Sequence, residues 1–338
     1  MKRLTVPQIK LRYIIAIIIA CFIFVIMYLI TMNNHRISVF IIGDSISAGA
    51  GASQPEHKWW KRLSKNLKDQ YGMRIDVEND SLGGNDTYSA YCRLMRKPEN
   101  SEYDVILICS GANDGSRLDL YYENLLRGIS LKYPYATVFC ILQSSENEHP
   151  EKIEVIRELA DYYGAKTIDM IRAFEESGYS YADLSNDGVH PNDLGQDIYL
   201  SKISDAFSTC IHEGEFLTEP LRRIDTPLNT AVDDWGEYSF FSLKDMEKIN
   251  ELEYELMVPC TEAIIGVDYY AVKGAQTINA FSSGKTLFRK ELKRDDVIGM
   301  EFNDLENMSC EIKESIIISF SSKEMKDSFK GINISAVR

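Results

Sequence analysis

The sequence predicts an α/β domain built on a parallel sheet, preceded by one transmembrane helix and followed by a β-sandwich-like module. Short apolar runs alternate with amphipathic stretches from residue 37 to residue 212, which is typical of strands alternating with helices. Some of these runs are apolar at every position, such as "VILIC" at 105–109, as expected for parallel strands covered on both faces. A long uncharged run lies before this region, and a turn-rich β pattern follows it.

The uncharged run "YIIAIIIACFIFVIMYLITM", residues 13–32, is long enough to cross a bilayer as a helix. Four cations and no acid precede it, so residues 1–12 are expected as a cytoplasmic tail and the rest of the chain outside the cell membrane. A cleaved signal peptide is one alternative, but no A-x-A-like site follows the run. A lipidated Cys21 is another, but nine apolar residues follow this cysteine. We therefore expect a single-pass protein, of the kind found in a bacterial envelope.

Charge and cysteine content restrict the partners. Residues 33–338 carry a net charge of −18, since the four cations before them belong to a chain total of −14, and such a surface repels nucleic acid. Six cysteines follow the apolar run, and their even number permits disulfides outside the cytoplasm. Cys109 and Cys140 lie within strand-like runs and are expected to be buried thiols. The cysteine spacings indicate no metal site.

The expected elements of the α/β domain, residues 37–212, follow the hydrophobic pattern. Strands are expected at Ser38–Ile42, Ile75–Glu78, Val105–Ser110, Thr137–Leu142 and Lys166–Asp169, and helices near Trp59–Tyr71, Leu118–Lys132, Glu151–Tyr163 and Asp193–Ile211. Since parallel strands end at a common carboxyl edge, a site is expected there.

Three loops at this edge, and a fourth segment before the last helix, carry unusual polar residues. "GDSIS" (43–47), "NDSLGGNDT" (79–87) and "GAND" (111–114) follow the first three strands, and "DGVHPN" (187–192) precedes the last helix. Each loop alone reads as ordinary turn chemistry. Their joint order along the chain is the informative feature.

In this order the loops resemble the SGNH (GDSL) hydrolase superfamily, over about half of the chain. The resemblance implies a three-layer, flavodoxin-like α/β/α domain that hydrolyses esters without a metal or organic cofactor. It implies Ser45 as the nucleophile, with Asp187 and His190 completing a catalytic triad. The oxyanion hole would consist of the Ser45 N–H, the Gly84 N–H and the Asn113 side chain. Gly83 beside Gly84 leaves that block ambiguous by one position.

The chemistry needs these residue types. A serine hydroxyl is a weak nucleophile at neutral pH and requires a base within hydrogen-bond reach, which His190 would provide. Asp187 would hold the imidazole in the productive tautomer, and amide donors would stabilise the negative charge that develops on the attacked carbonyl.

Other polar residues near these loops are expected in lesser roles. Asp44 and Asp114 are expected to bind backbone N–H groups of their loops. His149 lies in a loop that reaches a substrate if the site extends beyond the fourth strand. In the simplest case all four other histidines, His35, His57, His149 and His212, are expected to face solvent.

Residues 220–338 form the expected β-rich accessory domain, after a proline-containing linker. Short β runs at Glu237–Leu243, Ala263–Tyr270, Thr277–Phe281, Val297–Phe302, Ser315–Phe320 and Gly331–Val337 suggest an antiparallel sandwich. Residues 242–257 are ambiguous, because Ser242 and Asp245 form a capping-box pattern while Leu252, Tyr254 and Leu256 alternate as in a strand. Every residue of the predicted site precedes Asn192, so the module is expected to lie outside it.

Location and resemblance together predict a serine esterase that removes acyl groups, O-acetyl foremost, from a cell-surface polysaccharide or peptidoglycan. An O-acetyltransferase with the same triad remains an alternative, as do a lysophospholipase or thioesterase and a non-catalytic glycan-binding protein. The expected partners are an acylated glycan or other ester and the membrane.

Overall fold

The computed structural model describes residues 22, 36–146, 149–213, 220–293 and 295–337. The predicted cytoplasmic tail and, apart from Phe22, the predicted span 13–32 lie outside these residues. Within the described part of the chain, no helix combines the length and the apolar character needed to cross a membrane.

A five-stranded parallel sheet forms the centre of the first domain, in the order β2-β1-β3-β4-β5. Its strands are β1 (Ile37–Gly43), β2 (Ile75–Ser81), β3 (Val105–Cys109), β4 (Thr137–Leu142) and β5 (Lys166–Asp169). Every residue of β3 and β4 is buried, including Cys109 and Cys140, which are free thiols. The wholly apolar runs therefore are parallel strands covered on both faces, as predicted.

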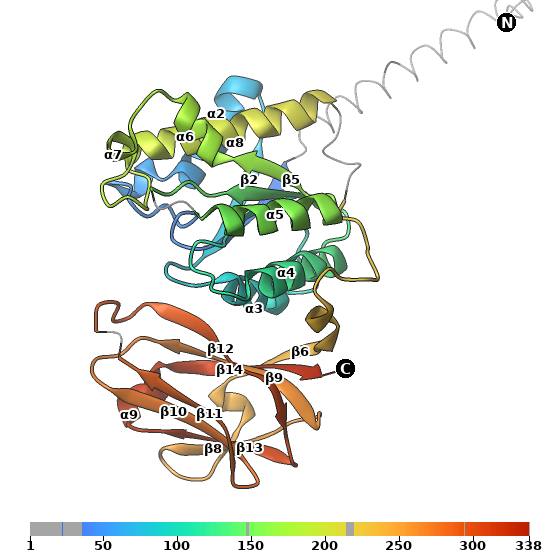
Figure 1. The fold of residues 1–338 in the computed structure, drawn as a ribbon, viewed down its shortest axis with the longest axis vertical. Coiled ribbons are helices and arrows are strands. Elements are labelled where there is room, and N and C mark those ends of the chain that lie inside the picture. Colours follow the sequence, from blue (N-terminus) through green and yellow to red (C-terminus); the bar gives the residue numbers. More distant parts are fainter. Residues whose placement is uncertain (1–21, 23–35, 147–148, 214–219, 294, 338) are drawn as a thin grey trace, which may run out of the picture.

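Helices cover both faces of this sheet (Figure 1). One face carries α2 (Trp59–Tyr71), α6 (Met170–Glu176) and α8 (Asp193–Glu213), whereas the other carries α3 (Thr87–Arg96), α4 (Leu118–Lys132) and α5 (Pro150–Tyr163). Two short elements, η1 (Pro55–His57) and α7 (Tyr181–Leu184), lie in the connections. The predicted three-layer α/β/α domain is confirmed.

Helix α3 is the main element that the hydrophobic pattern did not reveal. Residues 87–94 are all buried, so the polar side chains of this ten-residue helix face the protein interior and form no solvent-exposed stripe. Its outer face is covered by the second half of the chain. The short helices α6 and α7 were also missed, since each spans too few residues to establish a period.

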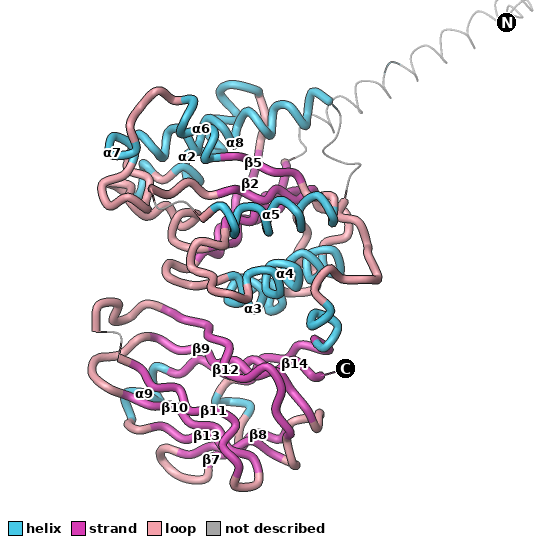
Figure 2. Tube along the Cα trace, viewed as in Figure 1, coloured by secondary structure: helices cyan, strands magenta, loops and turns pink. Residues whose placement is uncertain are grey.

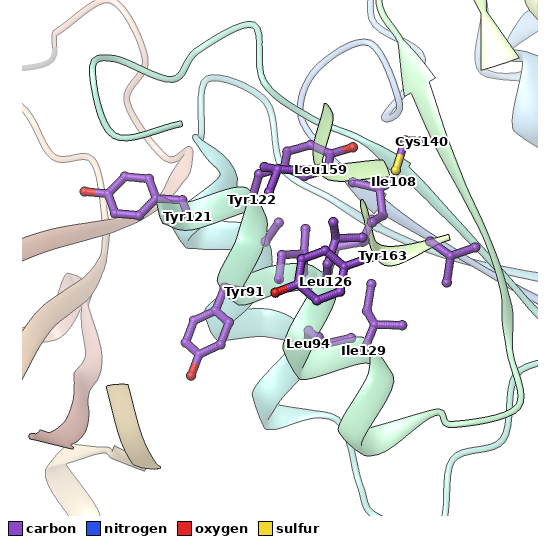
Figure 3. Close-up of a cluster of buried hydrophobic side chains, with 14 of the residues drawn as sticks. Tyr91, Leu94, Ile108, Tyr121, Tyr122, Leu126, Ile129, Cys140, Leu159 and Tyr163 are labelled. Carbon is purple, nitrogen blue, oxygen red and sulfur yellow. The ribbon is translucent and has the colours of Figure 1, made fainter. Parts of the chain in front are cut away.

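The layer beneath the sheet is a continuous apolar cluster in which Ile108, Tyr122, Leu126 and Leu159 pack together (Figure 3). The same cluster includes Trp235 and other side chains from the C-terminal half, among them Ile264. The apolar core therefore extends from the α/β domain into the region that follows it, which makes independent movement of the two parts costly.

Two antiparallel sheets make up the C-terminal module, in the orders β11-β10-β13-β8-β7 and β12-β9-β14-β6 (Figure 2). The strands are β6 (Trp235–Phe241), β7 (Glu247–Lys248), β8 (Glu253–Met257), β9 (Glu262–Tyr270), β10 (Gln276–Ser282), β11 (Lys285–Leu292), β12 (Glu301–Glu311), β13 (Ser315–Phe320) and β14 (Phe329–Val337), with short helices η3 (Thr230–Asp234), η4 (Leu243–Asp245) and α9 (Lys323–Ser328). Side chains from both sheets enclose one apolar core, as expected of a sandwich.

Two sequence expectations for the module are corrected or resolved. The strand expected at Val297–Phe302 begins only at Glu301, and β11 was not predicted. Both interpretations of residues 242–257 hold, because the capping box of Ser242 and Asp245 starts η4, and Tyr254 and Leu256 alternate within β8.

The sheet that contains β12 and β9 packs against α3 (Figure 1). Tyr91 of α3 meets Trp235 edge to face, with ring centroids 5.2 Å apart, and Arg96 of α3 forms an ion pair with the buried Asp268 of β9. At Gly266 a Cβ would lie 2.0 Å from the Tyr88 hydroxyl, so only glycine permits this approach of the helix to β9. Helix α3 thus lies between the two parts of the molecule, and its apolar side chains belong to the cluster that Trp235 and Ile264 of the second part join.

Candidate active site

Ser45 lies on the turn directly after β1, at the carboxyl edge of the sheet. Gly43 ends the strand where a Cβ would lie 1.9 Å from the Cys109 carbonyl oxygen, so the close approach of β1 to the end of β3 requires glycine. The next residue, Asp44, is fully buried and accepts the Ile46 N–H at 2.9 Å. The buried Asp44 carboxylate thus stabilises the turn through its hydrogen bond to Ile46. Ser45, between these two residues, is half-buried.

His190 bridges Ser45 and Asp187. Its Nε2 lies 2.9 Å from the Ser45 Oγ, and its Nδ1 lies 2.7 Å from Asp187 Oδ2. Because a carboxylate accepts hydrogen bonds, Nδ1 carries the proton and Nε2 is free to accept from the serine hydroxyl. Ser45 and His190 are 145 positions apart in the chain. The three predicted triad residues therefore meet through the fold, in the order serine, histidine, aspartate that nucleophilic catalysis needs.

The Asp187 carboxylate is held in place by its own loop. Its Oδ1 accepts the backbone N–H groups of His190 at 2.7 Å and of Val189 at 2.9 Å. The hydrogen bond from the His190 ring, followed by that from the His190 backbone, holds the Asp187 pKa well below its usual range. The carboxylate therefore stays ionised beside the imidazole at any pH at which the histidine acts as a base.

Two further loops meet beside Ser45. A Cβ on Gly83 would lie 3.6 Å from the Ser45 Cβ, while Gly84 is exposed and has a φ of +71°. Asn113 is also exposed, and its side-chain Nδ2 donates to the Asn85 carbonyl oxygen at 2.9 Å. The three predicted oxyanion residues therefore lie on adjoining loops, with Gly83 next to the serine and Gly84 one position further on. Their roles as donors stay a prediction.

A second Ser-His-Asp cluster lies on the surface, where Ser53 and Asp193 both contact Nδ1 of His57, at 3.1 Å and 2.7 Å. Since both partners use the same ring nitrogen, this imidazole cannot pass a proton from the serine while bonded to the acid. The cluster instead joins the 49–53 turn to the start of α8, where Asp193 also accepts the Ser53 N–H at 2.9 Å. His57 is exposed, as predicted.

Buried carboxylates brace the loops of the site. Burial raises the Asp44 pKa to about 6, although a hydrogen bond from Gln143 opposes the shift. Burial also raises the Asp114 pKa to about 6, opposed by bonds from Thr87, whose N–H and hydroxyl lie 3.0 Å and 2.9 Å from Asp114 Oδ2. The role predicted for Asp44, a bond to a backbone N–H of its own loop, is confirmed, whereas Asp114 binds the Thr87 N–H of the preceding loop instead of its own.

The motifs did not reveal three supporting residues. Gln143 donates to both Asp44 oxygens at 2.9 Å and accepts the Ala112 N–H at 3.2 Å, so it connects the first and third loops. Its position at the carboxyl end of β4 is a signal that could have identified it. Arg93, buried in α3, donates to the Gly43 carbonyl oxygen at 3.0 Å. Asn85, also buried, has no sequence signal, because its partners lie in the module.

A cavity of about 450 Å³ opens beside the triad. Its wall includes Ile46, Ala112 and Val189, which are the chain neighbours of Ser45, Asn113 and His190. Phe174 and Tyr181 contribute apolar surface, and His149 and Lys152 are among its polar lining. His149 therefore lines the cavity beside the triad, and its contact with a substrate stays a prediction. The described residues include no group of three or more His, Cys, Asp or Glu side chains suited to a metal ion.

The family profile of the GDSL-like lipase/acylhydrolases matches residues 41–198, which contain all the motif residues described above. This segment belongs to that family. The family match supports a carboxylic ester hydrolase, and the Ser45, His190 and Asp187 contacts described above lie within the matched residues. An arylesterase from Vibrio mimicus is 34% identical over 79 residues, which are 23% of this chain and 38% of the arylesterase.

Both parts of the chain have structural counterparts in a two-domain esterase (CEX) active on acetylated mannans. Its crystal structure matches with a TM-score of 0.71 and 14% identity, covering 92% of this chain and 95% of the esterase. The structure of such an esterase crystallised with mannopentaose matches with a TM-score of 0.68, 13% identity and coverage of 92% and 94%. At these identities the likeness establishes the fold, a GDSL domain followed by a β-rich module.

Proposed function

We propose that this protein is a serine esterase that removes acyl groups, O-acetyl foremost, from a polysaccharide of the cell surface. The observation that carries the proposal is the placement of His190 between Ser45 and Asp187, within 2.9 Å and 2.7 Å of their side-chain oxygens. Such an arrangement activates a serine hydroxyl toward an ester carbonyl.

In the proposed mechanism, the Ser45 Oγ attacks the ester carbonyl while its proton moves to His190 Nε2. The oxyanion of the tetrahedral intermediate is stabilised by the backbone N–H groups of Ser45 and Gly84 and by the Asn113 amide. His190 then protonates the departing sugar hydroxyl, and an acyl group remains on the serine. Water, deprotonated by the same nitrogen, releases this group as a carboxylate and restores Ser45.

The cavity beside the triad supports a carbohydrate as the alcohol component of the ester. His149, Lys152 and Glu175 offer hydrogen bonds to sugar hydroxyls, and the 53%-exposed ring of Tyr179 offers a face for stacking. The two-domain esterase that shares this fold acts on acetylated mannans, which makes O-acetylated mannan the first substrate to test.

We propose that residues 13–32 anchor the esterase in the cell membrane with the GDSL domain outside. The uncharged run and the four cations before it support this topology. Deletion of residues 1–35 should move the protein from the membrane fraction to the soluble fraction. In spheroplasts, protease should digest residues 36–338 without detergent, and digestion only after permeabilisation would contradict the topology.

The enzymatic test is acetate release from acetylated mannan and xylan, together with labelling by a fluorophosphonate. Ser45→Ala should abolish both, because the attacking atom is lost while a small residue remains on the turn. Ser53→Ala is the matched control, since it removes the serine of the surface cluster and should retain both signals. Labelling and turnover that survive in Ser45→Ala would contradict the assignment of the nucleophile.

A further inference from the structure

The loop at residues 83–85, between β2 and α3, contains the Gly83–Gly84 peptide. Because both residues are glycines, local backbone sterics do not restrict this peptide to one orientation. Gly84 has a φ of +71°, and glycine adopts positive and negative φ about equally readily. The peptide between Gly83 and Gly84 can therefore turn over at little local cost, as between the common β-turn types. Such a turn would direct the Gly84 N–H away from the oxyanion.

The Asn85 side chain holds this peptide. Its Nδ2 donates to the Gly83 carbonyl oxygen at 3.0 Å. In a planar trans peptide the N–H points opposite to the C=O, so a bond that fixes the Gly83 carbonyl also fixes the direction of the Gly84 N–H. The Asn85 main chain acts on the other donor, because its carbonyl oxygen accepts one Asn113 Nδ2 proton at 2.9 Å and leaves the second proton for a ligand.

Asn85 is in turn held by the edge of strand β12. Its Nδ2 also donates to the Glu301 carbonyl oxygen at 2.8 Å, and its Oδ1 accepts the Asn303 N–H at 3.0 Å. The side-chain amide thus pairs with two alternate residues of β12, much as a neighbouring strand would, while the opposite edge of β12 pairs with β9. The chemistry of these partners, two carbonyl oxygens and one N–H, determines the orientation of the amide.

This contact is dry and well packed. Asn85 is 3% exposed and Asn303 1% exposed, so water does not compete for these hydrogen bonds. Between the two bonded positions, the buried Phe302 places its ring 3.5 Å from where a Gly84 Cβ would lie. Met300, just before β12, approaches the same loop, with its methyl group 3.4 Å from where a Gly83 Cβ would lie.

We propose that the β-rich module positions the oxyanion hole of the GDSL domain, with Asn85 as the positioning residue that connects strand β12 to both amide donors. This inference rests on the proposed esterase function. It corrects the expectation that the module lies outside the site: although it supplies none of the predicted triad or donor groups, it holds the loop on which Gly84 lies. The module is then required for turnover even of an ester with no sugar to bind.

The test is Asn85→Asp in the full chain, assayed on p-nitrophenyl acetate. This change keeps the acceptor for the Asn303 N–H and replaces the Nδ2 donor by an oxygen that faces two carbonyl oxygens. We expect kcat to fall about a hundred- to a thousandfold, with KM changed less than about threefold, because donors to the oxyanion act mainly in the transition state. Asn85→Ala, which introduces no charge, should give a similar loss.

Tyr238→Phe is the control for a general weakening of the interface between α3 and the β-rich module. The Tyr238 hydroxyl lies 3.3 Å from the Cys92 carbonyl oxygen of α3 and 2.6 Å from Asn333 Oδ1, away from the loop. This variant should lower thermal stability and leave kcat within about twofold of the wild type. A loss of kcat as large as that of Asn85→Asp would attribute the effect to the interface as a whole and overturn the proposal.

A double-mutant cycle with Asn113→Ala separates positioning from scaffolding. If Asn85 acts through the donors, the fold-loss of kcat in the double variant should be clearly smaller than the product of the two single fold-losses. If Asn85 has an independent structural effect, the fold-loss in the double variant should equal that product. Absence of ester turnover in the wild type would refute the esterase function itself. Wild-type turnover in a folded Asn85→Asp or Asn85→Ala protein, or failure of both variants to fold, would refute the positioning role alone.

Discussion

Asp86, next to the oxyanion loop, makes the stability of this protein depend on pH in a direction opposite to that of most carboxylates. It is the N-cap of α3 and accepts the Ser89 N–H at 3.1 Å. Burial, together with the nearby charge of Asp114, raises its pKa from 3.8 to about 7. Asp86→Asn removes the charge but keeps a capping oxygen, since asparagine and aspartate cap helices about equally well.

The magnitude follows from proton linkage. Because the pKa of Asp86 is higher in the folded state, the folded protein binds more protons than the unfolded chain between the two values. The stabilisation that protonated Asp86 adds to the free energy of unfolding is therefore lost as pH rises from about 4 through about 7. With about 1.36 kcal/mol per pKa unit, the folded protein loses about 2 to 3 kcal/mol through this group between pH 5 and pH 8.

Urea unfolding of the wild type and Asp86→Asn at about pH 5 and pH 8 measures this loss. The variant should gain about 2 to 3 kcal/mol over the wild type as pH rises between these values. Asp161→Asn, which removes an exposed acid of α5, is the control and should follow the wild type at both pH values. If Asp86→Asn and the wild type showed the same change with pH, the buried charge would not be the cause.

Three further outcomes are expected. Asn113→Ala should lower kcat on p-nitrophenyl acetate about a hundred- to a thousandfold with little change in KM, and an unchanged kcat would exclude Asn113 as an oxyanion donor. His190→Ala should lose as much turnover as a serine variant, whereas Asp187→Asn should keep more residual activity because the base survives; the reverse order would contradict their roles. Gly266→Ala should lower the melting temperature, since its Cβ would lie 2.0 Å from the Tyr88 hydroxyl, and an unchanged melting temperature would show that this interface is loosely packed.

The sequence alone determined the parallel sheet and the identity of the residues that meet beside it. Strands β1, β3 and β4 are mainly apolar runs with turn residues after them, and these are local features. The triad followed from the same information, because the strands of a parallel sheet end at one edge and the order of the loops therefore identifies what meets there. His190 reaches Asp187 within one loop, three residues away.

Only the tertiary structure decided what surrounds α3 and what holds the oxyanion loop. Residues 87–94 of α3 are all buried, including its polar side chains, so no solvent-facing surface distinguishes this helix in the sequence. Asn85 bonds to main-chain atoms of Glu301 and Asn303, more than 200 positions later in the chain. Backbone carbonyl and N–H groups are the same in every residue type except proline, so no pattern of side chains records which of them a distant asparagine will bind.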